Sequence, residues 1–191
     1  MWSLNNGLSI NEKGEKASFP VSENVHIHHI LHSSTAPAPI SKNIAEQAHS
    51  LAEQLADTLE VVGLLAVEFF LTQDDQLIVN EMAPRPHNSG HYTIDACHTS
   101  QFQQHIRAIT GLPLGKTDTH TPAVMINILG DLWSKTSPPW NLLFKNPSTQ
   151  LHLYDKGEAR KGRKMGHYTV LDQNLSLAKK EAEALFLELK D

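Results

Sequence analysis

Glu68 and Glu81 are the residues of this sequence whose type and spacing most directly suggest chemistry. Each stands among apolar neighbours in one of two strand-like runs of VEFFLTQDDQLIVNEM (67–82), and the polar pair Asp74–Asp75 separates the runs. Two such runs around a short polar turn predict a β-hairpin. Both acids would lie in the middle of this hairpin, where a carboxylate on each strand needs an explanation.

The register of the hairpin decides whether the two acids meet. A turn centred on the two aspartates pairs Phe70 with Val79 and puts Glu68 opposite Glu81, with Cβ atoms about 5 Å apart on one face. Like charges in this position destabilise a sheet. Three arrangements would relieve the repulsion: solvent between two exposed carboxylates, protonation of one acid with a raised pKa, or a divalent cation that binds both. Mg²⁺ completes its octahedron with phosphate oxygens and water, so the third arrangement predicts a Mg²⁺–nucleotide site.

The segment after the second run, APRPHNSGHYT (83–93), is rich in groups that bind anions. Arg85 lies between two prolines, which fix φ and lower the entropy of the segment. Its guanidinium can bind a phosphate or a carboxylate through two hydrogen bonds. His87 and Asn88 add further hydrogen-bonding groups, and Gly90 permits a close backbone approach. Arg85 by itself is as consistent with a surface salt bridge, but beside the acid pair it favours an anion-binding active site.

A second concentration of positive charge occurs in YDKGEARKGRKMGH (154–167). Its basic residues are Lys156, Arg160, Lys161, Arg163 and Lys164. Such a cluster is typical of a solvated hairpin tip, which is the simpler interpretation. Two glycines make the backbone of the segment adaptable, so a phosphate clamp is the alternative, and spacing leaves both open.

Four of the twelve histidines lie close together in NVHIHHILH (24–32). They are His26, His28, His29 and His32. A metal site is one interpretation, but no cysteine or carboxylate nearby completes a ligand shell. We therefore favour an exposed strand edge.

Elements around these residues follow from hydrophobic periodicity and from turn signals. Before residue 114 the sequence predicts strands within 17–36, an amphipathic helix after its N-cap Ser41, the hairpin strands 63–72 and 76–82, a loop over 83–98, and a short helix from Thr99 or Ser100 to Gly111. After residue 115 it predicts a strand over 122–130, a hairpin over 151–172 and a closing helix over 174–189. We place a domain boundary near 112–120, which divides the chain into residues 1–114 and 115–191.

Composition limits the class of protein. The formal net charge is −5, which gives no general attraction to nucleic acid. The single cysteine, Cys97, excludes an internal disulfide and fits a reducing compartment. No apolar run reaches the roughly 18–20 residues that span a bilayer, and the first residues lack the pattern of a signal peptide. We expect a cytoplasmic protein with no membrane and no nucleic-acid partner.

The runs VGLLAVEFFL (62–71) and LIVNEMAPRPHNSGHYTIDACHTSQFQQHIRAITGLPLG (77–115) closely resemble the N5-carboxyaminoimidazole ribonucleotide synthetases. These ligases of purine biosynthesis, also called phosphoribosylaminoimidazole carboxylase ATPase subunits, belong to the ATP-grasp superfamily. The resemblance covers about residues 15–170, and NEMAPRPHNSGH is its most specific stretch. It implies an α+β fold: the later half of an ATP-grasp domain, with an antiparallel sheet and packed helices, followed by a small β-rich C-terminal domain.

The resemblance also implies an activity and roles for the candidate residues. The family uses ATP and bicarbonate to make carboxyphosphate, which carboxylates the 5-amino group of aminoimidazole ribonucleotide and leaves ADP and phosphate. By resemblance, Glu68 and Glu81 bind Mg²⁺, or alternatively Mn²⁺, and Asn80 lies beside them at the nucleotide. Arg85, His87 and Asn88 correspond to groups that hold bicarbonate or carboxyphosphate. Lys156 and Arg163 correspond to contacts with the ribonucleotide phosphate and nearby ATP groups.

Half of the nucleotide clamp of a full-length member is not identifiable in this sequence. The N-terminal α/β domain, the Gly-rich loop over the phosphates and the adenine-binding hinge have no counterpart here, so the chain resembles the C-terminal portion of a synthetase. We expect the isolated chain to bind ATP weakly and not to turn over, and the full-length protein to form a homodimer. The alternatives are a formate-dependent glycinamide ribonucleotide transformylase, another ATP-grasp ligase, or a non-catalytic module derived from the ATP-grasp fold.

Overall fold

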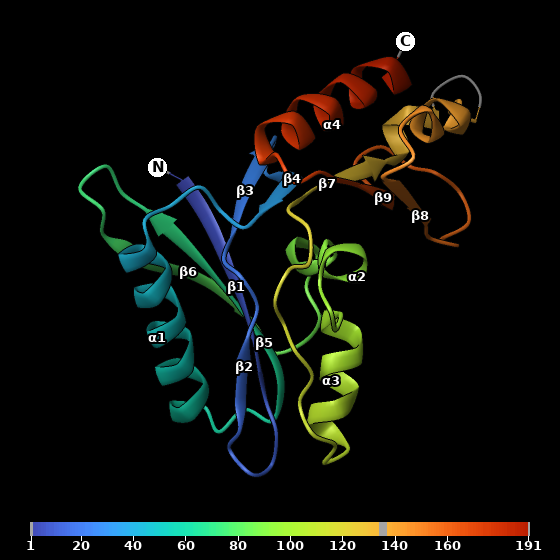
Figure 1. Cartoon of the computed structure of the whole chain (residues 1–191). Coiled ribbons are helices and arrows are strands. Elements are labelled where there is room, and N and C mark those ends of the chain that lie inside the picture. Colours follow the sequence, from blue (N-terminus) through green and yellow to red (C-terminus); the bar gives the residue numbers. More distant parts are fainter. Residues whose placement is uncertain (1, 134–136, 191) are drawn as a thin grey trace.

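A computed structural model describes residues 2–133 and 137–190 of this chain. Figure 1 shows one long, twisted sheet with helices packed along it. The sheet has nine strands in the order β6-β5-β1-β3-β4-β7-β9-β8, and β2 pairs with β1 beside this path. The strands are β1 (Trp2–Ile10), β2 (Lys16–Ser18), β3 (Ser22–Ile27), β4 (Ile30–Ala36), β5 (Gly63–Leu71), β6 (Leu77–Ala83), β7 (Ala123–Leu129), β8 (Thr149–Leu153) and β9 (Lys164–Leu171). All of the strand pairs described are antiparallel, which confirms the expected α+β class.

Four α-helices and three short 3-10 helices accompany the described strands. The α-helices are α1 (Lys42–Thr58), α2 (Thr93–Ala96), α3 (Gln101–Ile109) and α4 (Leu175–Lys190), and the 3-10 helices are η1 (Asn88–Gly90), η2 (Gly130–Trp133) and η3 (Trp140–Lys145). The segment 83–98, expected to be a loop, therefore contains η1 and α2. None of the described helices combines the length and the hydropathy that a membrane crossing requires.

Helix α1 covers one face of the sheet half formed by β1 and β5. The side chain of Ser41 caps the helix by accepting a hydrogen bond from the Ile44 N–H at 3.3 Å, as the sequence predicts. Small residues on the inner side of α1 let the helix lie close to the strands. The cluster joins Ile44, Ala48, Ala52 and Ala56 to Leu4, Leu8, Leu65, Val67 and Phe69.

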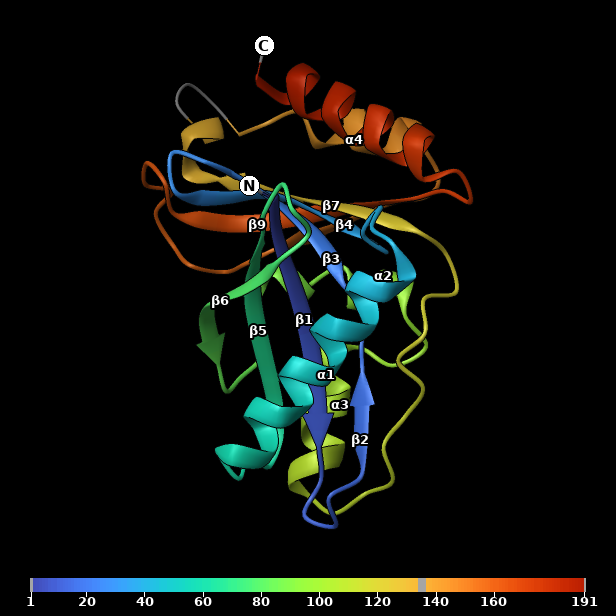
Figure 2. The same cartoon turned by 90° about the vertical axis from the view of Figure 1, so that its left-hand side faces the viewer.

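Helix α3 lies on the opposite side of β1 and β5 (Figures 1 and 2). Ser100 caps it by accepting from the Gln103 N–H, and Gly111 follows the end of the helix with a φ of 70°, which favours glycine. The inner side of α3 carries two buried glutamines, Gln101 and Gln104. Its large apolar residues, Phe102, Ile106 and Ile109, are exposed.

Among the described strands, β1 is the one that the sequence analysis missed. Its sequence, WSLNNGLSI, alternates small polar and apolar residues and contains a glycine, so propensity argues weakly for a strand. The structure nevertheless places β1 between β3 and β5, where its apolar side chains Leu4 and Leu8 reach the core under α1. Tertiary packing decides the conformation of this segment.

Hairpin β5–β6 has a bulge that the sequence analysis did not foresee. Near the turn, Phe70 pairs with Ile78 and Phe69 with Val79, so the expected pair Phe70–Val79 is wrong. The register then shifts, Asn80 is left without a partner, and Glu68 pairs with Glu81 as expected. If the ladder continued from the turn without a bulge, Glu68 would face Asn80 and Glu81 would point to the other face of the sheet, because side chains alternate along a strand.

The C-terminal part of the chain continues the same sheet. Strand β7 pairs with β4 from Ser33↔Ile126 to Ala36↔Ala123, and β9 and β8 follow it in order. Helix α4 covers β7 and β9 through a second apolar cluster and lies above them in Figure 2. The expected hairpin over 151–172 and the closing helix are confirmed as β8–β9 and α4. The boundary near residue 114 stays a prediction.

Candidate functional site

Glu68 and Glu81 line one open cavity of about 450 Å³ between the β5–β6 hairpin and the basic hairpin β8–β9. Both acids therefore lie on the same face of the sheet, as their pairing requires. Further lining comes from the turn between β3 and β4 and from the loop after β6. The lining residues are His26, His29, Ile30, Leu31, His87, Lys156, Gly162 and Lys164. The cavity thus has two carboxylates on one side and two lysines on the other.

Glu68 is the buried member of the acid pair, and its carboxyl has a raised pKa. Burial raises the pKa of its carboxyl above the ordinary value, the charge of Glu81 adds to the rise, and Lys164 opposes it. Glu68 is only 7% exposed, whereas Glu81 faces solvent. A buried carboxylate beside a second carboxylate favours a cation that can bind both.

Lys164 is a site residue to which the sequence analysis gave no separate role. It was visible as one of five basic residues, but only its place at the start of β9 aims it into the cavity. Burial lowers the pKa of its amine, and the charge of Glu68 opposes that shift. Lys164 and Glu68 therefore stabilise each other's charged form across the cavity.

His87 joins the loop after β6 to the acid pair. Its Nδ1 lies 3.7 Å from Glu68 Oε1 and 2.7 Å from Ser89 Oγ. Burial lowers the pKa of the imidazole, and Arg85 and Lys164 lower it further. A neutral His87 beside an anionic substrate can accept or donate a hydrogen bond without repelling the nearby lysines.

Arg85 and Asn88 have different surroundings from His87. Arg85 is exposed, and its side chain donates to the Pro86 carbonyl at 3.1 Å, so its guanidinium keeps most of its donors free. Asn88 faces β7, where its amide exchanges two hydrogen bonds with Asn127, at 2.9 and 2.7 Å. Asn88 therefore ties the loop to the C-terminal part of the sheet.

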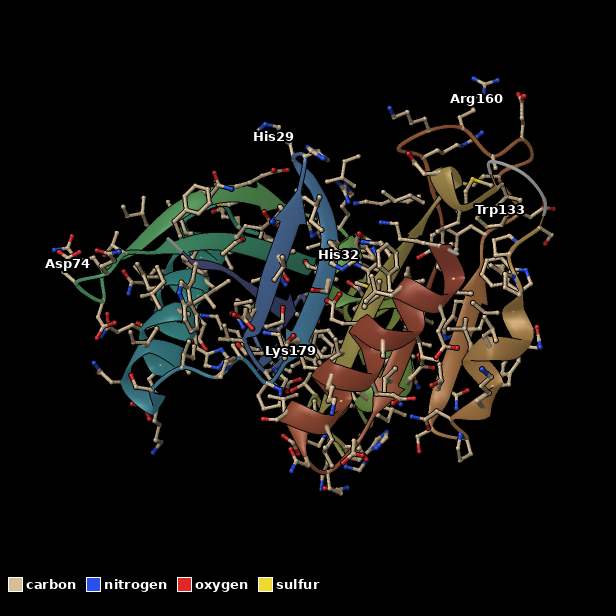
Figure 3. All side chains as sticks on the ribbon, turned by 90° about the horizontal axis from the view of Figure 1, so that it is seen from above. His29, His32, Asp74, Trp133, Arg160 and Lys179 are labelled. Atoms are coloured by element: carbon tan, nitrogen blue, oxygen red, sulfur yellow. The ribbon has the colours of Figure 1, made fainter. Side chains whose placement is uncertain are left out.

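The two basic residues proposed for phosphates lie at the tip of the β8–β9 hairpin. Lys156 lines the cavity, and Arg163 donates to the Glu158 carbonyl at 3.2 Å within the tip. Arg160, which had no assigned role, reaches out into solvent at the far end of this tip (Figure 3). The tip therefore contributes Lys156 to the cavity of the acids, while its far end is a solvated loop.

The four histidines of NVHIHHILH do not converge on one point. His28 and His29 form the turn between β3 and β4 with positive φ values of 50° and 63°, and Figure 3 shows His29 at the outer end of this hairpin. His32 lies on β4 and pairs with Glu183 of α4 at 3.3 Å. His26 and His29 line the cavity of the acid pair, so two of the four belong to the candidate site.

Comparison with known proteins finds relatives that share this arrangement. The ATP-grasp domain model matches residues 9–102, and the model described as phosphoribosylaminoimidazole carboxylase C-terminal domain matches residues 123–181. The chain is 54% identical over 160 residues to N5-carboxyaminoimidazole ribonucleotide synthase of Bacillus subtilis (strain 168), covering 84% of this chain and 41% of that protein. The chain corresponds to part of the N5-carboxyaminoimidazole ribonucleotide synthases, with an ATP-grasp match followed by a carboxylase C-terminal match.

Solved structures of N5-carboxyaminoimidazole ribonucleotide synthases have the same fold. The enzyme from Thermotoga maritima superposes with a TM-score of 0.89 at 42% identity, covering 99% of this chain and 52% of that chain. The Aspergillus clavatus enzyme, solved with ADP and 5-aminoimidazole ribonucleotide, gives 0.89 at 34% identity, covering 98% and 51%. This chain therefore spans about half the length of the synthases that it matches.

A further group of titratable residues comes from α2, β8 and β9. Within the described residues, Asp95, His152 and His167 bring possible metal-ligand atoms to within 4.8 Å of one another. The two imidazoles are stacked, however, with centroids 4.5 Å apart and planes 16° apart. Ring nitrogens direct their lone pairs in the ring plane, so stacked rings do not converge on one ion. We interpret the group as an ion pair, because His152 Nε2 lies 3.0 Å from both Asp95 oxygens.

Proposed function

We propose that this chain provides the Mg²⁺- and phosphate-binding half of an ATP-dependent ligase that carboxylates 5-aminoimidazole ribonucleotide with bicarbonate. The observation that carries the proposal is the pairing of Glu68 with Glu81 on the floor of a cavity whose other side holds Lys156 and Lys164. The relatives support the same reaction, because the proteins that this chain matches over about half of their length are synthases of N5-carboxyaminoimidazole ribonucleotide.

The donor set suits Mg²⁺. Two carboxylates on one face supply the hard oxygen ligands that Mg²⁺ prefers, and the open cavity leaves room for phosphate oxygens and water. When bound, the ion would neutralise charge on the ATP phosphates during phosphoryl transfer. The raised pKa of Glu68 supports this fit, since a carboxylate that is costly to ionise alone is stabilised by a cation. Mn²⁺ prefers similar ligands and should replace Mg²⁺.

The reaction needs positioning and charge neutralisation more than a protein nucleophile. A bicarbonate oxygen attacks the γ-phosphorus of ATP, which releases ADP and forms carboxyphosphate. The 5-amino nitrogen of aminoimidazole ribonucleotide then bonds to the carboxyl carbon as the C–O bond to phosphate breaks, and the nitrogen loses a proton. In this proposal Arg85 and His87 would hold the anionic carboxyphosphate beside the acid pair, and Asn88 would keep their loop on β7, supported by the His87–Glu68 and Asn88–Asn127 contacts.

The remaining candidate residues would bind phosphate groups and the nucleotide. Lys156 and Arg163 would contact the phosphate of the ribonucleotide and nearby phosphates of ATP, while Asn80 presents its exposed amide next to Glu81. We further propose a cytoplasmic location and, for the full-length protein, a homodimer. The exposed apolar side of α3, with Phe102, Ile106 and Ile109, is a surface that a second copy would cover.

Titration of the purified chain with ADP tests the proposal directly. ADP binding should depend on Mg²⁺, and Glu68→Gln or Glu81→Gln should weaken it by about 10-fold or more. Asp74→Asn is the matched control, because Asp74 is an exposed acid at the far end of the same hairpin (Figure 3). Mg²⁺-independent binding, or equal losses in all three variants, would contradict the proposed site.

Substrate choice is tested with the same chain. It should bind 5-aminoimidazole ribonucleotide in preference to glycinamide ribonucleotide, with Lys156→Ala reducing the binding, and it should release no ADP when ATP and bicarbonate are added. Preference for glycinamide ribonucleotide would favour a transformylase. Failure to bind either ribonucleotide or ADP would favour a non-catalytic module.

A further inference from the structure

Gln101 is a buried polar residue with no role in the mechanism described so far. It is the first residue of α3 and is 3% exposed. Its side-chain Oε1 accepts a hydrogen bond from the His87 N–H at 2.9 Å, and its Nε2 donates to the His87 carbonyl at 2.8 Å. One side-chain amide thus binds both backbone groups of a single residue in the loop after β6.

The second Nε2 hydrogen of Gln101 reaches another histidine of this loop. Gln101 Nε2 lies 2.8 Å from His91 Nδ1. The two contacts with the His87 backbone fix the orientation of the amide, since only one orientation matches an N–H with an oxygen and a carbonyl with a nitrogen. Nδ1 of His91 must then accept, so a neutral His91 carries its proton on Nε2. Burial lowers the pKa of His91 to about 4, which keeps the ring neutral.

Gly90 and Thr93 both lie in close contact with Gln101. A Cβ added to Gly90 would lie 2.7 Å from Gln101 Oε1, so any other residue there would displace the side chain. Thr93 Oγ1 accepts from the Gln101 N–H at 2.9 Å and donates to the Gly90 carbonyl at 2.6 Å. The backbone and the side chain of Gln101 are therefore both bonded to the 87–93 segment.

We propose that Gln101 is a positioning residue that holds His87 against the acid pair and fixes the tautomer of His91. Only His87 stands between Gln101 and the acid pair in this proposal. The Gln101 amide fixes the His87 backbone, and the His87 imidazole lies 3.7 Å from Glu68 Oε1. The proposal rests on the proposed function, since it assigns Gln101 to the same Mg²⁺–nucleotide site.

Gln104 offers a matched control on the same helix. It is fully buried, and its amide makes the same pair of backbone contacts with Gly115, from Nε2 to the carbonyl at 3.0 Å and from the N–H to Oε1 at 2.8 Å. This clamp holds a segment outside the cavity. Gln101→Met and Gln104→Met therefore remove equivalent buried clamps, but only the first removes contacts to the site loop.

The first measurement is the ¹⁵N NMR of the imidazoles in the 191-residue chain. Wild type and Gln104→Met should both show His91 as the Nε2–H tautomer. Gln101→Met should change the His87 and His91 signals, and Gln101→Glu should move the His91 proton to Nδ1, because a carboxylate can only accept. Unchanged His87 and His91 signals in both Gln101 variants, or equal changes in Gln104→Met, would overturn the proposal.

The second measurement is the affinity for ADP in the presence of Mg²⁺. Gln101→Met should weaken it by about 10-fold, the typical effect of losing a group that orients a metal-site residue, while Gln104→Met should leave it within about twofold. Equal losses in the two methionine variants would indicate a general packing effect and overturn the positioning role. If wild type binds no ADP, the proposed function fails, and the imidazole signals still decide whether Gln101 fixes the loop.

Discussion

At the scale of single residues, the site is organised around one buried carboxylate. Glu68 is shielded from solvent and faces a second acid, so its ionised form is costly unless a cation balances it. Lys164 supplies part of this balance from β9. The sequence indicated the acid pair but not which acid is buried, because burial depends on β1, which pairs with β5, and on the other segments that pack around β5.

Replacement of Glu68 should stabilise the protein when Mg²⁺ is absent. The pKa of Glu68 is raised in the folded state, so between the unfolded and the folded pKa the folded chain binds more protons, and stability falls as the pH rises through this window. Glu68→Gln should therefore raise the free energy of unfolding at about pH 7 by up to about 1 kcal/mol. Urea denaturation in a chelator should show this gain shrinking towards about pH 4. A loss of stability at pH 7 would contradict the strained acid pair.

Lys164 should matter for nucleotide binding, although it received no role from the sequence. Lys164→Met removes the amine that faces Glu68 across the cavity, so the affinity for ADP with Mg²⁺ should fall by about 10-fold. Lys161→Met is the control, because Lys161 is an exposed lysine of the same tip that does not line this cavity. Isothermal titration calorimetry measures the ADP affinity of both variants. Equal losses of affinity would show that the total charge of the tip, and not Lys164 in particular, supports binding.

At the scale of elements, the bulge in β6 is the feature that brings the acids together. The turn alone sets a register in which Glu68 would face Asn80, and the extra residue corrects this one position before the acids are reached. Deletion of Asn80 should remove the bulge and join Val79 directly to Glu81, which leaves Glu81 opposite Glu68 in a regular ladder. The deletion variant should therefore keep ADP binding that depends on Mg²⁺, and circular dichroism should show a folded chain. Loss of binding by a folded deletion variant would show that the site needs Asn80 or the bulge itself in addition to the paired acids.

The sequence predicts some elements well and others not at all, for physical reasons. Helices α1 and α3 have strong caps and a clear period, and hairpin β5–β6 has alternating apolar residues around a polar turn. Strand β1 has none of these signals, because its conformation is imposed by its neighbours on both sides. The roles of Lys164 and Gln101 were hidden for a similar reason: each depends on contacts between segments far apart in the sequence.

At the scale of the whole molecule, an ion pair fastens the basic hairpin to the site loop. Hydrogen bonding to Asp95 of α2 raises the pKa of His152 on β8, with burial acting in the opposite direction. A raised histidine pKa contributes stability that is fully present below the unfolded pKa of about 6.5 and is lost as the pH rises through the folded value. This contact therefore holds the hairpin most strongly in mildly acidic solution.

Asp95→Asn should destabilise the chain in a pH-dependent way. The loss in free energy of unfolding should be at most about 1 kcal/mol near pH 6, because His152 is partly exposed, and it should be smaller near pH 9. Asp155→Asn, at an exposed acid of the same hairpin tip, should cost little at either pH. Thermal denaturation at the two pH values measures both variants, and a pH-independent loss would assign Asp95 a packing role only.

The unbroken ladder from β4 to β7 has a mechanical consequence for the molecule. Hairpin β5–β6, which carries the two glutamates, and hairpin β8–β9, which carries the lysines, belong to one hydrogen-bonded sheet. No flexible linker separates the described strands where β4 pairs with β7. A ligand in this cavity would therefore meet a spacing between the β5–β6 hairpin and β9 that is set when the chain folds, and only the loops at the rim would adjust to it.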